Sequence, residues 1–118
     1  MTPEQQVTNL ELSRKLKELG VKQESLFWWI APESPDRPLL YYGHYDNAFN
    51  KTNHAFIFSA YTVAELGELL GKKMLETYRN AGHVLLSSYG LPQFLEPTEA
   101  DARAAMLVYL IENKLITL

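Results

Sequence analysis

The sequence contains no cysteine. A chain without thiols cannot form disulfides, thiolate zinc sites or iron–sulfur clusters, and it has no cysteine nucleophile, so these classes of site are excluded. Because no disulfide is needed to stabilise the fold, a reducing compartment fits best. We therefore expect the protein in the cytoplasm.

Long apolar runs and targeting signals are also missing. No apolar run approaches the roughly 20 residues of a membrane span, and residues 1–6 lack the basic and then apolar order of a signal peptide. We therefore expect no association with a membrane.

A strong excess of charge of one sign is absent as well. The 11 Lys and Arg residues stand against 14 Asp and Glu residues, a net charge of −3. The basic residues at 14–17 and 72–73 are interleaved with Glu, so the clustered positive charge that duplex nucleic acid requires is missing. What the chain does have is 47% hydrophobic residues over 118 positions, which predicts a single domain over residues 1–118 with one core.

Capping motifs predict where the helices begin. Residues 8–11 and 62–65 have capping-box spacing, in which Thr caps the helix and Glu three positions later reaches back to the cap amide. Thr98, followed by Asp101, predicts the start of a third helix at the carboxyl end. Gly20 ends the first helix, and Val21 is expected to fold back over the last turn.

Short apolar and aromatic runs predict the strands. The runs at 25–31, 39–45 and 54–60 follow one another without an intervening helix, which favours antiparallel neighbours. Residues 72–89 suit either a helix followed by a strand or a hairpin with a loop at 80–82, and the hairpin is favoured. Gly90, Pro92 and Pro97 indicate a loop. The predicted fold is α+β, an antiparallel sheet of about five strands packed with an N-terminal, a short middle and a C-terminal helix.

Three blocks of the sequence are similar to a known family. Residues 8–29, with the run LGVKQESLFWW, residues 60–70, and residues 98–116, with the run ADARAAMLVYLIEN, together resemble a family of short uncharacterised phage and prophage proteins. The resemblance covers nearly half of the chain, and family members usually have proline at the position of Gly71. The family implies a bacterial host cytoplasm as the location, and it implies no activity or catalytic residue.

Aromatic residues are concentrated in the first two predicted strands and just beyond them. Because neighbouring strand residues point to opposite faces, Trp28 and Trp29 lie on opposite sides of the sheet, and one of them is expected to point outward. An outward set of rings could anchor a protein partner or stack on a base. The alternative is that helices or a second copy of the chain cover this face. The candidate binding residues are Trp28, Trp29, Arg37, Tyr41, Tyr42, His44 and Tyr45.

Motifs typical of catalysis or cofactor binding are weak. His44 and Asp46 share a face of an extended chain, but a third ligand from His54 or His83 would be needed for a metal site. Ser87 and Ser88 lack the glycine-flanked turn of a nucleophile elbow. Glu65 is explained as a helix cap, and the glycines are scattered singly, without a phosphate loop. We therefore expect no catalytic residue, no metal and no cofactor.

Three functions remain open on the sequence. The first is a non-enzymatic interaction module that acts on a host or phage protein through the aromatic sheet surface. The second is a small oligomeric protein that sequesters a nucleotide ligand, with phosphate bound by Arg37, Lys51 or Arg79. The third is a structural protein of the virion or of its assembly. A homodimer is compatible with each of them.

Overall fold

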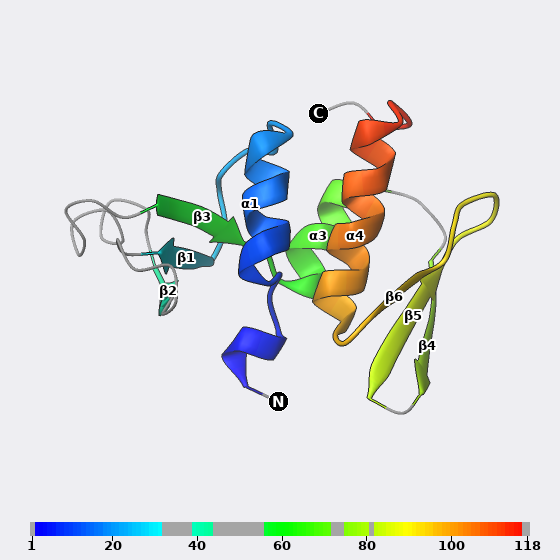
Figure 1. Cartoon of the computed structure of the whole chain (residues 1–118), viewed down its shortest axis with the longest axis horizontal. Helices are drawn as coiled ribbons and strands as arrows, with labels where there is room; N and C mark the ends of the chain where they lie inside the picture. The colour runs from blue at the N-terminus through cyan, green and yellow to red at the C-terminus, as the bar shows by residue number, and fades with distance from the viewer. Residues whose placement is uncertain (1, 32–38, 44–55, 72–74, 81, 117–118) are drawn as a thin grey trace.

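The structure is a computed structural model, and it describes residues 2–31, 39–43, 56–71, 75–80 and 82–116. In these residues the fold is α+β, as predicted, with three α-helices and six strands that all pair antiparallel. The strands form two separate three-stranded sheets. The helices lie between the two sheets, so that the layers follow one another along the long axis of a molecule of 44 × 33 × 21 Å (Figure 1).

The first sheet contains β1 (Phe27–Ala31), β2 (Leu39–Tyr42) and β3 (Phe56–Ala60) in the order β2-β1-β3. These strands confirm the three predicted runs within the described residues, and β1 begins two residues later than its run. Residues 44–45 of the second run and 54–55 of the third lie outside the described residues. Helix α1 (Leu10–Glu18) packs on β3.

The second sheet contains β4 (Glu76–Asn80), β5 (His83–Ser87) and β6 (Phe94–Glu96) in the order β4-β5-β6. The favoured hairpin is confirmed, but the expected loop was one residue too long, because Asn80 pairs with His83. Strand β6 lies where the sequence indicated only a loop. Its backbone pairs with Val84–Leu86, which local sequence could not reveal.

Two sheets replace the single sheet of about five strands that was expected. Helix α3 (Val63–Leu70) follows β3 directly and packs against α4 (Glu99–Glu112). The chain therefore crosses the helical layer before the β4–β5 hairpin forms on its other side (Figure 1).

Local hydrogen bonds confirm two of the predicted caps and correct one. Thr62 and Glu65 form the complete capping box of α3, and Thr98 accepts a hydrogen bond from the Asp101 amide. Helix α1 is capped by Asn9 and not by Thr8. The Thr8 hydroxyl is instead buried against Ser13 and accepts a hydrogen bond from the backbone N–H of Tyr61. A tertiary contact therefore prevailed over the local cap.

The predicted end of α1 is confirmed. Gly20 has a φ of 91°, its N–H donates to the Lys17 carbonyl, and the N–H of Val21 donates to the Leu16 carbonyl. This is the hydrogen-bond pattern of a Schellman motif, in which glycine relieves the strain of a positive φ.

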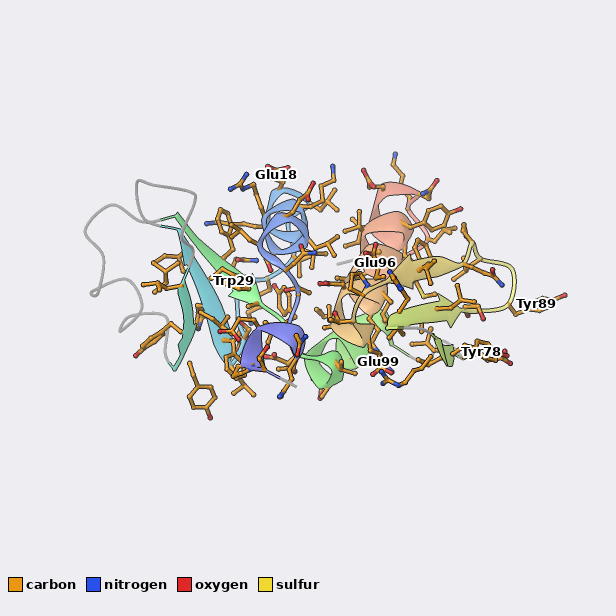
Figure 2. All side chains as sticks on the ribbon, turned by 60° about the horizontal axis from the view of Figure 1, so that its bottom comes forward. Glu18, Trp29, Tyr78, Tyr89, Glu96 and Glu99 are labelled. Atoms are coloured by element: carbon orange, nitrogen blue, oxygen red, sulfur yellow. The ribbon has the colours of Figure 1, made fainter. Side chains whose placement is uncertain are left out.

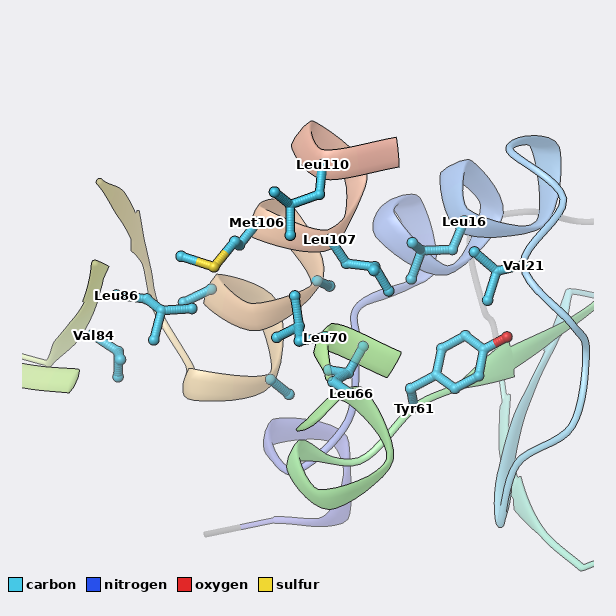
Figure 3. Packing of buried hydrophobic residues seen from close by; sticks show 13 residues of the cluster. Leu16, Val21, Tyr61, Leu66, Leu70, Val84, Leu86, Met106, Leu107 and Leu110 are labelled. Atoms are coloured by element: carbon cyan, nitrogen blue, oxygen red, sulfur yellow. The ribbon is translucent and has the colours of Figure 1, made fainter. Parts of the chain in front are cut away.

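The main hydrophobic core joins all three helices to the second sheet. Leu16, Leu66 and Leu107 are fully buried at its centre, and Leu86 reaches it from β5 (Figure 3). Tyr61 lies at the boundary with the first sheet, and its hydroxyl donates to the Lys22 carbonyl. Burial raises the pKa of this hydroxyl to about 12. Among the described residues, no helix is both long and apolar enough to span a bilayer.

Candidate protein-interaction surface

Both tryptophans of the predicted aromatic surface are buried. Their side chains lie on opposite faces of β1, as the alternation predicts, but only 2% of Trp28 and 8% of Trp29 is exposed. The Trp29 indole lies between the first sheet and α1 and donates to the Thr8 carbonyl at 2.6 Å (Figure 2). The Trp28 indole donates to the Gly43 carbonyl at 3.0 Å. The expectation of one outward tryptophan is therefore wrong, because both indoles have packing and hydrogen-bond partners.

The other predicted binding residues are only partly described. Tyr42 is 66% exposed and its ring contacts Phe27, with 5.1 Å between the ring centroids. Tyr41 is half-buried beside Trp28. Arg37, His44 and Tyr45 lie outside the described residues. Of the proposed set, Tyr42 is therefore the exposed aromatic residue among those that the structure describes.

A second and more continuous apolar surface lies on the second sheet. Tyr78, Leu85 and Leu95 stand opposite one another on its three strands, because Tyr78 pairs with Leu85 and Leu85 pairs with Leu95. Residues paired in this way share one face of the sheet. Tyr78 is 55% exposed, Leu95 is 62% exposed and Leu85 is partly exposed. We call this row of three residues the outer stripe.

The outer stripe lies on the exposed face of the second sheet, whereas α4 covers the opposite face. Val84 and Leu86 alternate with Leu85 along β5 and are buried in the main core. Phe94 precedes Leu95 and packs against Tyr109 of α4, with ring centroids 5.9 Å apart. Figure 2 shows Tyr78 and the fully exposed Tyr89 at the end of the molecule that is farthest from the first sheet.

Charged residues border the outer stripe on β4. The Tyr78 hydroxyl donates to the Glu76 carboxylate at 2.8 Å, and this hydrogen bond, together with the negative charge, raises the pKa of Tyr78. Arg79 points to the other face and lies 3.3 Å from the Glu99 carboxylate at the start of α4. The guanidinium of Arg79 is therefore already paired.

The cavities among the described residues have both apolar and charged walls. One of about 490 Å³ lies along α1 and reaches Glu96; Glu11, Arg14 and Lys15 give it charges of both signs. Another of about 320 Å³ is lined by Thr62 and Arg79, among others. Glu65 acts as a helix cap, and its second carboxylate oxygen accepts from the Leu26 amide. Among the described side chains, no group of three or more His, Asp and Glu could hold a metal ion.

Sequence reasoning missed the outer stripe, although part of its signal was present. In a hairpin where Asn80 pairs with His83, Tyr78 and Leu85 are equally distant from the turn and must be neighbours. Leu95 gave no such signal, because it lies between Pro92 and Pro97 in a segment that is typical of loops.

Comparison with protein-family models, with curated proteins and with solved structures gives no match for this chain.

Proposed function

We propose that this protein is a non-enzymatic interaction module that binds another protein through the outer stripe. One observation carries the proposal: Tyr78, Leu85 and Leu95 form a continuous apolar row on a sheet face that is exposed while the opposite face is packed on α4. Apolar and aromatic side chains that are gathered on a surface favour a protein partner, because burying them releases water and rings serve as anchors. The resemblance to phage and prophage proteins makes a host or phage protein the expected partner.

The charges near the stripe favour protein binding over nucleotide binding. Among the three cations considered for phosphate, Arg79 is the described one, and it is already engaged by Glu99. A protein partner needs no free cation at this position, whereas a phosphate would compete with the Glu99 carboxylate for the guanidinium.

The proposal is tested by comparing the wild-type chain with a Tyr78→Ser, Leu95→Ser variant. A protein recovered with the wild type from expressing bacteria would be purified, and its binding to both chains measured by calorimetry. We expect the double variant to bind at least about tenfold more weakly, since two anchor side chains are removed. Leu26→Ser is the matched control. Leu26 is also an exposed leucine, but it lies next to β1 of the first sheet and outside the outer stripe, so its substitution should leave the Kd unchanged.

Two results would contradict this function. In the first, repeated purifications return only the bait. In the second, the purified partner binds the double variant and the wild type with the same Kd, which would locate its site elsewhere. Far-UV circular dichroism of each variant verifies the fold, which exposed substitutions should leave intact.

A further inference from the structure

The described strand edges are not equally protected against pairing with another chain. At the β3 edge, side chains bind two of the outward backbone groups: the Lys17 ammonium donates to the Ile57 carbonyl, and the Gln23 side-chain oxygen accepts from the Ser59 backbone N–H. Thr8 likewise accepts from the amide of Tyr61, which follows the strand. Capping of this kind prevents a strand from adding at the β3 edge.

The two edges of the second sheet differ from each other. Strand β6 has three residues and is flanked by Pro92 and Pro97, so it offers a short and interrupted edge. Strand β4 has five residues, contains no proline or lysine, and pairs without a bulge along its whole length with β5. Among the described residues, β5 is its only strand neighbour. The β4 edge is therefore the open one of this sheet.

We infer that β4 pairs antiparallel with β4 of a second copy of this chain, about a two-fold axis at Tyr78. Asn80 and His83 flank a two-residue connection and are expected to exchange hydrogen bonds, so the backbone groups of Thr77 and Arg79 point away from β5. In a pair centred on Tyr78, Thr77 of one copy and Arg79 of the other exchange backbone hydrogen bonds. This register is also the one in which all five residues of both strands overlap.

The charges of β4 favour this register. It sets Glu76 opposite the uncharged position 80 and sets Thr77 opposite Arg79, so no like charges meet. A register centred one residue later would instead place the two Arg79 residues opposite each other, which is unfavourable. The outer stripes of the two copies become continuous through the Tyr78–Tyr78 contact, because the two-fold axis keeps both outer faces on the same side.

The size of the edge sets the strength of the dimer. A stable interface buries roughly 800 Å² per partner, and a five-residue edge with its adjacent side chains is well below that area. We therefore expect a reversible dimer, with a Kd in the micromolar to millimolar range.

Sedimentation equilibrium of the purified full chain tests this inference with a matched pair of substitutions. Thr77→Lys places a positive charge opposite Arg79 of the other copy, and the two-fold axis repeats this repulsive pair on both sides of Tyr78. We therefore expect the Kd to rise about tenfold. Thr77→Glu changes the same exposed position but places a negative charge there, and the Kd should stay unchanged or fall. Leu115→Ser, at an exposed position outside the sheet, should leave the Kd as in the wild type.

A wild-type chain that stays monomeric into the millimolar range would overturn the inference. So would equal Kd values for the Thr77→Lys and Thr77→Glu variants, because dimerisation would then use another surface. The experiment contains no partner protein, and its failure would leave the proposed function of the outer stripe standing.

Discussion

At the residue scale, Asp101 shows how a single side chain connects distant parts of the chain. Its carboxylate accepts a hydrogen bond from the backbone N–H of Asn9 at 2.8 Å, although the two residues are 92 positions apart. Asp101 lies in the first turn of α4 and Asn9 caps α1, so this bond joins the starts of two helices. Burial raises the pKa of Asp101, while the hydrogen bonds from Asn9 and Thr98 oppose that rise.

The raised pKa of Asp101 predicts a pH-dependent stability. Above an ordinary pKa of about 4, the folded chain holds this proton more tightly than the unfolded chain. The contribution of Asp101 to the free energy of unfolding is therefore complete below about pH 4, where its carboxyl is protonated in both states, and is lost as the pH rises through the raised pKa of the folded chain. Thermal unfolding over this range should show the wild-type Tm falling relative to the Tm of Asp101→Asn, which keeps the acceptor oxygen and removes the charge.

Glu4→Gln serves as the control for this experiment, because Glu4 is exposed. Its Tm should follow the wild-type Tm at every pH. A constant difference between the Tm of the wild type and that of Asp101→Asn would show that burial does not shift the titration of Asp101.

At the scale of elements, β1 is a strand with both faces buried, and this explains its unbroken apolar sequence. Trp29 packs with Val7 and Phe58 on the face toward α1, and Trp28 packs with Ile30 and Ile57 on the other. A strand that is covered on one face only usually alternates apolar and polar residues. The paired aromatics therefore serve packing and do not form an exposed surface.

Substitution of either tryptophan should destabilise the fold by a similar amount. We expect Trp28→Ala and Trp29→Ala each to lower the free energy of unfolding by about 3–5 kcal/mol, as large-to-small changes in a core do. Tyr42→Ala, at an exposed position of β2, should change it by no more than about 0.5 kcal/mol. Urea unfolding followed by far-UV circular dichroism measures all three. A tryptophan variant as stable as Tyr42→Ala would contradict the burial described for that indole.

At the scale of the whole molecule, the helical layer makes the two sheets depend on one another. Leu107 of α4 and Leu16 of α1 belong to the same buried cluster as Leu86 of β5, and α1 also packs on β3. Neither sheet can keep its inner face covered once the helices separate. The molecule is therefore expected to unfold as one cooperative unit.

Cooperativity can be measured because both tryptophans lie in the first sheet. Tryptophan fluorescence reports that end of the molecule, whereas far-UV circular dichroism reports all helices and strands. The two transitions in urea should coincide for the wild type and for Leu107→Ala, whose midpoint should fall with a loss of about 2–5 kcal/mol. Separate transitions would mean that one sheet unfolds independently of the helical layer.

The sequence by itself determined the features that depend on neighbouring residues. Four of these features arise from hydrogen bonds between residues a few positions apart: the Thr62–Glu65 capping box, the Thr98 cap, the end of α1 at Gly20 and the β4–β5 hairpin. The α+β class followed from the order of these elements. Local geometry is enough here, because the hydrogen-bonding partner of each backbone group, whether a side chain or another backbone group, lies only a few residues away along the chain.

Only the tertiary structure decided the features that depend on distant contacts. The Thr8 hydroxyl does not cap α1, because it is hydrogen-bonded to Ser13 and to the backbone N–H of Tyr61. Strand β6 depends on its backbone pairing with β5, which the sequence near residues 94–96 does not encode. The strands divided between two sheets because α3 carries the chain across the helical layer. This division also decided which aromatic rings are exposed. Trp28 and Trp29 are buried in the first sheet, whereas the outer stripe of the second sheet is exposed because α4 packs on the opposite face of that sheet.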